Sequence, residues 1–154
     1  MTRHLEMKMP PLLATALCGW AMHEIDRRSP DTIFVALRHP WLAAAVAVIG
    51  LLVVVAGVVA FRRHRTSVNP LRSDGVSALV VGGIYRHTRN PMYVGMVLWL
   101  AAWALWLGNA AASIVVPMLW YWLDVYQVAP EERLLQARFG ADFDDYCRRV
   151  RRWI

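Results

Sequence analysis

The sequence predicts an all-α, polytopic membrane protein with about four transmembrane helices and a cytoplasmic C-terminal amphipathic helical tail. Three observations lead to this fold class. Hydrophobic residues make up 58% of the 154-residue chain, and they gather in long uncharged runs, which are typical of transmembrane helices. Clusters of basic residues separate these runs. The clusters alternate between dense and sparse along the chain, as the loops of multi-span membrane proteins do. The length indicates a single domain over 1–154.

Four apolar segments are candidates for membrane spans, and they cover about 10–25, 40–61, 92–107 and 110–128. The second is the clearest, because 22 consecutive residues carry no charge and about 20 suffice to cross the hydrocarbon core. The first is short in its uncharged part, so its helix could be tilted, partly interfacial or packed within a bundle. Gly108 and Asn109 form a turn signal between the last two segments, which predicts a tight helical hairpin.

The third span has a marked beginning. Asn90 is a preferred helix N-cap residue, and Pro91 suits the first helical position. Directly before them lie Arg86, His87 and Arg89. The helix therefore begins with unpaired N–H groups and basic side chains at one level, an arrangement that favours an anionic group.

The remaining segments flank the predicted bundle. The apolar run 76–85 is too short to span, so we expect an extended or re-entrant stretch against the bundle. After Pro130 the tail predicts an amphipathic helix over about 131–139, which Gly140 ends, and then a second helical stretch. One face of this tail carries Phe139, Phe143, Tyr146 and Val150. Lipid phosphates are the expected partners of Arg148, Arg149, Arg151 and Arg152.

The distribution of Lys and Arg predicts how the protein crosses the membrane. Of the 17 Lys and Arg residues, 14 lie before residue 10, within 62–90 or after residue 128. Under the positive-inside rule, both termini and the 62–90 loop face the cytoplasm, and a bacterial inner membrane is the expected location. The start of the third span and Glu131-Glu132 would then lie on the same side, where they could form one site.

Composition narrows the possible functions. Two cysteines and five scattered histidines show no metal-ligand spacing, so we expect no metal site. A surface beside anionic lipid headgroups explains the net charge of +6, so membrane lipids rather than nucleic acid are the expected partners. The basic start and first apolar run lack a small-residue cleavage site, so we expect them to be retained.

Basic groups at the start of one helix and the paired carboxylates of Glu131 and Glu132 suggest a site for a small zwitterion. Structural explanations stay open for both groups. Arg86 and Arg89 could be anchors at the membrane interface. The two acids follow Pro130, where negative charge favours the helix dipole.

In their order and spacing, these motifs resemble the isoprenylcysteine carboxyl methyltransferase family, which is related to the phospholipid N-methyltransferases, as a short, bacterial-type member. The matching residues are Gly83-Ile84-Tyr85, Arg89-Asn90-Pro91-Met92-Tyr93-Val94-Gly95, Glu131-Glu132, Leu135, Phe139-Gly140, Tyr146 and Arg148-Arg149-Val150. The resemblance covers about 68–153, including Val68-Asn69-Pro70, whereas the first two helices match only in pattern.

The resemblance implies an integral membrane methyltransferase that binds S-adenosyl-L-methionine at the cytoplasmic face, within about 68–153, and releases S-adenosylhomocysteine. The acceptor would be a lipophilic or amphiphilic small molecule with a carboxylate, amine or thiol, arriving laterally from the bilayer. Carried over by position, the candidate cofactor-binding residues are Ser77, Ala78, Leu79, Val80, Tyr85, Arg86, Arg89, Asn90, Pro91, Met92, Tyr93, Glu131 and Glu132. Neither the acceptor nor the oligomeric state follows from the sequence.

Two departures from the family pattern concern the cofactor and the substrate. The eukaryotic motif has His where this chain has Asn90, whose side chain could keep only a hydrogen bond to the cofactor. Segment 110–128 contains no Arg to match the family's substrate-contacting one, which does not support a prenylcysteine acceptor. The candidates for a catalytic role are Arg89, His87 and Asp124, the last because it is an ionisable group inside an apolar segment. Trp99, Trp103 and Trp106 recur on one helical face, either as packing residues or as one wall of a substrate groove.

Two other functions stay open at this point. A small non-enzymatic four-helix membrane protein, such as an exporter or assembly factor, would line its bundle with polar groups at mid-depth, and only Asp124 is a candidate. An NADPH-dependent membrane reductase would share the C-terminal architecture of some sterol reductases. The chain contains no Gly-rich dinucleotide fingerprint to favour it.

Overall fold

The computed structural model of this protein describes residues 9–29, 38–63 and 79–154. Within these ranges the chain forms helices and no strand, which confirms the predicted all-α class. The elements are α1 (Pro11–Arg28), α2 (Pro40–Arg63), the 3₁₀ helix η2 (Gly83–Arg86), α3 (Pro91–Leu107), α4 (Ala110–Ser113), α5 (Val115–Leu123), the π-helical turn η3 (Asp124–Val128), α6 (Ala129–Phe139) and α7 (Ala141–Arg149). Ser77, Ala78 and the Val68-Asn69-Pro70 motif lie outside the described residues.

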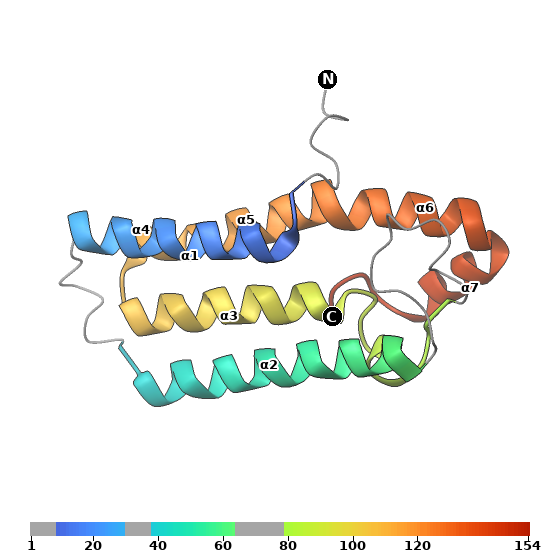
Figure 1. Ribbon diagram of the computed structural model, residues 1–154, viewed down its shortest axis with the longest axis horizontal. Helices are drawn as coiled ribbons and strands as arrows, with labels where there is room; N and C mark the ends of the chain where they lie inside the picture. The colour runs from blue at the N-terminus through green and yellow to red at the C-terminus, as the bar shows by residue number, and fades with distance from the viewer. Residues whose placement is uncertain (1–8, 30–37, 64–78) are drawn as a thin grey trace, which may run out of the picture.

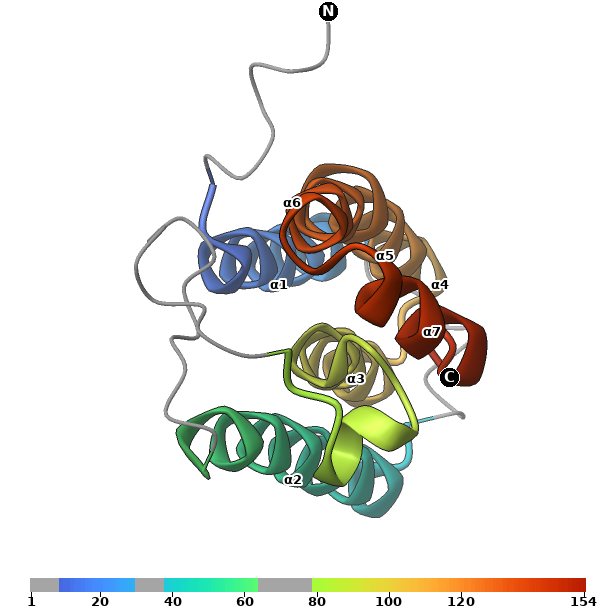
Figure 2. The same cartoon turned by 90° about the vertical axis from the view of Figure 1, so that its right-hand side faces the viewer.

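The long helices lie side by side, with α3 in the middle (Figure 1). Figure 2 shows α2 on one side of α3, and α1 with the arm from α4 to α6 on the other. Glycines let α2 and α3 approach closely. A Cβ atom on Gly95 would collide with Val54 Cγ2 and would lie 2.7 Å from the Gly50 carbonyl oxygen. Small residues commonly permit such backbone contact between membrane helices. This seam holds the start of α3 against α2.

The buried core lies where α1, α3 and α5 meet. Met22, Leu100, Leu119 and Leu123 are among its buried side chains. Many large apolar side chains on the outer faces of the helices are exposed, among them Trp41 in α2 (88% exposed) and Trp20 in α1 (64% exposed). An apolar exterior of this kind suits contact with lipid rather than with water.

Among the described residues, one helix is long and apolar enough to cross a membrane by length and composition. It covers Pro40–Arg62 within α2, in agreement with the span predicted for 40–61. A second apolar helix, Pro91–Leu107, is shorter. The other three spans, and the number of four, stay predictions.

The fourth predicted span, 110–128, is not one continuous α-helix. It breaks at Ile114 between α4 and α5, and its last five residues widen into the π turn η3. Each irregularity lies shortly before a proline, because Pro117 and Pro130 both lack the N–H group that the preceding turn would use. The arm therefore enters α6 through a π turn, a feature that is frequent at functional sites.

The predicted turn between the third and fourth segments is confirmed at the other end of the bundle. Gly108 has φ of 61°, a left-handed conformation that ends α3. Asn109 begins α4: its side-chain oxygen accepts a 3.0 Å hydrogen bond from the Ala112 N–H group. Its amide nitrogen donates to Asp26 Oδ1 at 3.1 Å and to the Ser29 carbonyl oxygen at 2.8 Å. One buried side chain thus joins α1 to the hairpin.

The C-terminal tail folds back on the same end as the start of α3. Gly140, with φ of 50°, separates α6 from α7, as its position in the sequence predicts. The predicted apolar face of the tail forms a small core of its own, made of Phe143, Tyr146 and Val150 with Leu79, Leu135, Phe139 and Cys147.

The segment before α3 also packs against the bundle, as predicted for the part that is described. Residues 79–81 have no regular structure, and η2 begins at Gly83, which turns the chain with φ of 61°. The ring of Tyr85 in η2 contacts Phe61 near the end of α2 edge to face, with centroids 5.3 Å apart. Val80, Tyr85 and Ala60 of α2 form a small buried cluster.

Candidate active site

Charged and hydroxyl side chains gather at the end of the bundle where α3 begins, on the right of Figure 1. They come from the loop before α3, the first turn of α3, the π turn, the first turn of α6 and the residues after α7. The members of this polar cluster are Arg89, Tyr93, Asp124, Glu131, Glu132, Arg152 and Trp153. The structure therefore brings the start of the third helix together with Glu131-Glu132, as the sequence predicted.

Tyr93 and Glu131 form the innermost pair of the cluster. The Tyr93 side chain is buried in the first turn of α3, and its hydroxyl group donates a hydrogen bond to Glu131 Oε1. Burial raises the pKa of the Glu131 carboxyl to about 7; the Tyr93 hydrogen bond opposes this shift, and the nearby Glu132 adds to it. Glu131 is consequently a carboxyl group that can gain or lose its proton near neutral pH.

Glu132 is held by two arginines. Arg89 Nη2 lies 2.9 Å from Glu132 Oε1. Arg152 contacts both oxygens, with Nη2 2.5 Å from Oε2 and Nε 3.2 Å from Oε1. All three side chains are at most 36% exposed, so these charge-assisted bonds are partly shielded from water. The neighbouring carboxyl groups of Glu131 and Glu132 thus have different partners.

Asp124 is also engaged, on the other side of Arg152. The Arg152 Nη1 atom donates to Asp124 Oδ1 and Oδ2 at 3.2 and 3.1 Å, and Trp153 Nε1 donates to Oδ1 at 2.8 Å. Asp124 therefore links the π turn to the end of the chain. Two carboxylates hold the Arg152 guanidinium group within the site, which contradicts the expectation that it meets lipid phosphates. Arg148 pairs with Asp145 at an exposed position, and its contact with lipid stays a prediction.

The loop before α3 binds the C-terminal backbone. The Arg89 N–H group donates to the Arg151 carbonyl oxygen at 3.1 Å, and Thr88 Oγ1 and Asn90 Nδ2 donate to the Arg152 carbonyl oxygen at 3.3 and 2.9 Å. Asn90 does precede α3, and Pro91 is its first residue. However, among the described residues the Asn90 side chain makes no capping bond to α3. Its amide nitrogen donates to the Arg152 backbone near the end of the chain instead.

Tyr85 completes the inner wall of this end. Its carbonyl oxygen accepts a 2.8 Å hydrogen bond from the Tyr146 hydroxyl group, which connects η2 to α7. Burial, with smaller contributions from the charges of Tyr146 and Glu131, raises the pKa of the Tyr85 phenol well above its usual value. Tyr85 therefore stays a neutral hydroxyl group close to Glu131.

The remaining candidate residues divide into supporting and peripheral ones. Pro91 is fully buried, and Met92 lies against Gly57 of α2. Val80 belongs to the core beside Ala60, and Leu79 to the core beside α7. Arg86 and His87 are exposed, and within the described part of the chain neither joins the polar cluster. The structure does not support the catalytic candidate His87 or a shared role of Arg86 with Arg89.

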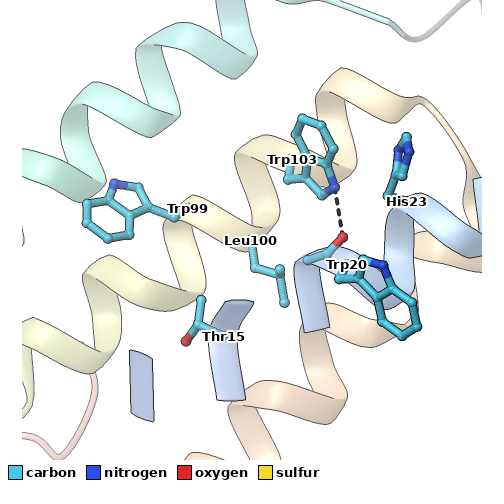
Figure 3. A pocket seen from close by; sticks show the side chains of 7 residues that line it. Thr15, Trp20, His23, Trp99, Leu100 and Trp103 are labelled. Atoms are coloured by element: carbon cyan, nitrogen blue, oxygen red, sulfur yellow. Dashed lines mark hydrogen bonds between the residues drawn. The ribbon is translucent and has the colours of Figure 1, made fainter. Parts of the chain in front are cut away.

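A groove runs between α1 and α3 along the bundle. Its volume is about 350 Å³, and its lining is Thr15, Gly19, Trp20, His23, Trp99, Leu100 and Trp103. Figure 3 shows the indoles of Trp99 and Trp103 on α3 with the α1 side chains beside them. Each indole is fixed: Trp99 Nε1 donates to the Ala47 carbonyl oxygen at 3.1 Å, and Trp103 Nε1 to that of Gly19 at 3.2 Å. Trp106 is 54% exposed and does not line this groove.

Sequence reasoning missed several of these residues. Arg152 and Trp153 stand in a basic tail in which four arginines look equivalent, and Thr88 carries no motif of its own. The α1 side of the groove was missed because nothing local shows which helix α1 will face. The sequence predicted no metal site. The described residues contain no group of three His, Cys, Asp or Glu side chains that could hold a metal ion.

The fold and the site together define a class of protein: a small helical membrane protein with a partly buried zwitterionic cluster at one end and an apolar groove between α1 and α3. A family model described as phospholipid methyltransferase matches residues 32–142. Because this is most of the chain, the protein belongs to the phospholipid methyltransferase family, a membrane methyltransferase family.

Three relatives match different lengths of the chain, and the one with the longest match is named as a methyltransferase. A probable protein-S-isoprenylcysteine O-methyltransferase of Oryza sativa subsp. indica is 25% identical over 133 residues, which are 82% of this chain and 68% of that protein. An uncharacterized protein of Haemophilus influenzae is 40% identical over 63 residues, 41% of this chain and all of that protein. A 15-cis-zeta-carotene isomerase of Arabidopsis thaliana is 37% identical over 69 residues, but these are only 44% of this chain and 18% of the isomerase. The long match and the family model both support a methyltransferase.

Proposed function

We propose that this protein uses S-adenosyl-L-methionine to methylate a lipophilic or amphiphilic acceptor at the cytoplasmic face of a membrane. The observation that carries the proposal is the polar cluster at the start of α3, in which Tyr93 binds Glu131 and Arg89 binds Glu132. The cluster lies in a chain of a methyltransferase family. The same end of the bundle holds most of the family motif.

The groups of the cluster suit the cofactor's amino-acid end, which carries an ammonium and a carboxylate. Arg89 Nε is buried and has no hydrogen-bond partner among the described residues, so it offers a donor to an anionic oxygen. Glu131 is bound by the hydroxyl group of Tyr93, and it offers a carboxylate to an ammonium group or to ribose hydroxyls. The aromatic faces of Tyr85 and Tyr93 suit adenine or the cationic sulfonium.

When bound, the cofactor supplies a methyl group on a positively charged sulfur, and the transfer is an in-line displacement. The residues of this chain then act mainly by positioning. A carboxylate or thiolate acceptor needs no base, whereas an ammonium acceptor must first lose a proton. Glu131, with a pKa of about 7, is the member of the cluster suited to accept that proton.

The apolar part of the acceptor is proposed to lie in the groove between α1 and α3 (Figure 3). Trp99 and Trp103 form its wall, and their hydrogen bonds keep the wall rigid. The relatives named protein-S-isoprenylcysteine O-methyltransferase make a carboxylate acceptor the first to test, and the family description makes a phospholipid the second. Replacing Trp103 by Ala should lower methylation of lipid extracts while Trp106→Ala does not. Equal activity in both variants would remove the groove from the proposal.

Binding of S-adenosylhomocysteine to the detergent-purified chain tests the cofactor. Isothermal titration should show saturable binding that Glu131→Gln and Tyr93→Phe each weaken about tenfold. Tyr121→Phe is the control, because Tyr121 is 62% exposed on α5. If Glu131 accepts the ammonium, wild-type binding should strengthen as pH rises through about 7. Absence of binding by the wild-type protein would refute the proposal.

The orientation is a separate part of the proposal. A cysteine introduced at Arg151, which is exposed, should react with a membrane-impermeant maleimide only in inverted inner-membrane vesicles. Both natural cysteines are replaced by Ser in this variant. Labelling in intact spheroplasts instead would place the site on the opposite face.

A further inference from the structure

Residues 150–153, which we name the C-terminal strap, return from α7 to the start of α3, where Figure 1 marks the chain end. Three hydrogen bonds from Thr88, Arg89 and Asn90 bind the strap backbone at Arg151 and Arg152. These bonds do not involve the Arg152 side chain. The position of the strap is thus fixed independently of the Arg152 guanidinium group.

The guanidinium of Arg152 spans two carboxylates of the site. It contacts both oxygens of Glu132 at 2.5 and 3.2 Å and both oxygens of Asp124 at 3.1 and 3.2 Å. Asp124 has a further donor in Trp153. Glu132 has a further donor in Arg89, at 2.9 Å. Arg152 is therefore the shared partner that ties the first turn of α6 to the π turn.

Glu132 is bound by both Arg89 and Arg152, and this affects how Arg89 can bind an anion. The Arg89 and Glu132 side chains are 13% and 18% exposed, so breaking their ion pair would strand a poorly hydrated carboxylate if that carboxylate had no other partner. Leaving a buried charge unpaired is strongly unfavourable. Because Arg152 also holds Glu132, Arg89 can turn towards a ligand while Glu132 stays paired.

We propose that Arg152 is a positioning residue of the cofactor site: by retaining Glu132, it lets Arg89 bind the carboxylate of the cofactor's amino-acid end. This inference rests on the proposed function. The arginine neighbours of Arg152 in the tail are placed differently. Arg148 pairs with Asp145, Arg149 Nε donates to the Asp145 carbonyl oxygen at 3.2 Å, and Arg151 is exposed.

A double-mutant cycle on S-adenosylhomocysteine binding tests the proposal, with the full-length protein in detergent. Arg152→Gln should weaken binding about tenfold or more. In a Glu132→Gln background the same substitution should change affinity little, because no carboxylate is left for Arg89 to abandon. The control is Arg151→Gln, which removes the same charge from an exposed neighbour on the strap and should leave affinity unchanged.

Unfolding temperatures identify variants that do not fold. If Arg152→Gln does not fold, Arg152→Lys is used in its place, because Lys keeps the charge but loses the two-pronged bond to Glu132. Arg152→Lys should weaken S-adenosylhomocysteine binding less than Arg152→Gln would. In the Glu132→Gln background this weakening should again disappear. Three results would overturn the inference. In the first, Arg152→Gln binds S-adenosylhomocysteine as tightly as Arg151→Gln does. In the second, Arg152→Gln lowers affinity equally in the wild-type and Glu132→Gln backgrounds, which would make the role of Arg152 purely structural. Lack of binding by the wild-type protein would refute the proposed function, and the inference with it.

Discussion

At the scale of single residues, two consecutive carboxyl groups have been given different surroundings. Glu132 faces the guanidinium groups of Arg89 and Arg152. Glu131 faces hydroxyl groups instead, with Tyr93 as its donor and Tyr85 nearby. Environments that separate the charge states of two acids are a recurring feature of active sites. Here the first acid is poised to titrate near neutral pH, and the second serves as the anchor for two cations.

The raised pKa of Glu131 predicts a pH-dependent stability. Its value moves from 4.5 to about 7 on folding, so between these values the folded protein holds a proton that the unfolded chain has lost. The stabilising contribution of the group is therefore complete below about pH 4.5 and is lost as pH rises through about 7. The cost at high pH is at most roughly 3 kcal/mol.

Thermal unfolding of the wild-type protein and Glu131→Gln, from pH 5 to pH 8 in detergent, measures this effect. The unfolding temperature of the wild-type protein should fall relative to that of the variant as pH rises. Parallel curves for the two proteins would show that Glu131 does not titrate in this range.

At the scale of elements, the seam between α2 and α3 determines where the site begins. Gly95 lies two residues after Tyr93, and its backbone is packed against Gly50 and Val54 of α2. Any shift of α3 along or away from α2 would move the Tyr93 hydroxyl relative to Glu131, which comes from a different arm. The glycines are thus part of the architecture that positions the cluster, although they do not contact it.

Gly95→Ala should accordingly destabilise the protein and weaken S-adenosylhomocysteine binding. The new methyl group would meet Val54 and the Gly50 backbone, and overpacking of this kind costs about 1–3 kcal/mol. Gly19→Ala in α1 is the matched control, because its methyl group would lie at an ordinary 3.8 Å from Leu100 Cδ1. Thermal unfolding of both variants decides the matter, and an equal effect of the two substitutions would contradict a tight α2–α3 seam.

At the scale of the whole molecule, polar interactions concentrate at the two ends of an apolar bundle. One end holds the cluster around Glu131 and Glu132. The other holds Asn109, which joins the start of α4 to Asp26 and Ser29 of α1, together with Arg38, whose Nε donates to the Leu107 carbonyl oxygen at 2.7 Å. The apolar length between the ends separates the chemistry of the first from the structural role of the second.

This separation predicts that stability and ligand binding can be changed independently. Asn109→Ala removes the partners of several buried polar groups and should destabilise the protein by about 2 kcal/mol or more. Because distant sites act almost additively, S-adenosylhomocysteine affinity should stay within about twofold of the wild-type value. A large loss of affinity in a folded Asn109→Ala variant would indicate coupling between the two ends.

Much of the fold could be read from local patterns. The second apolar segment, the turn at Gly108, the start of α3 at Pro91 and the break at Gly140 all appear where the sequence predicts them. Within 110–128, the π turn before Pro130 was not predicted. Uncharged length identified the segment, but the missing N–H group determined its geometry.

By itself, the sequence determined the helical class, the apolar segments and the composition of the site, because capping preferences, proline and glycine geometry, and runs of hydrophobic residues act over a few neighbours. The tertiary structure alone decided which arginine serves which acid, that the Asn90 amide binds the chain end, and that Trp103 but not Trp106 lines a groove. These depend on the path of the backbone after Gly140 and on the face that α1 presents to α3. Contacts between residues far apart in the chain arise only when the helices pack.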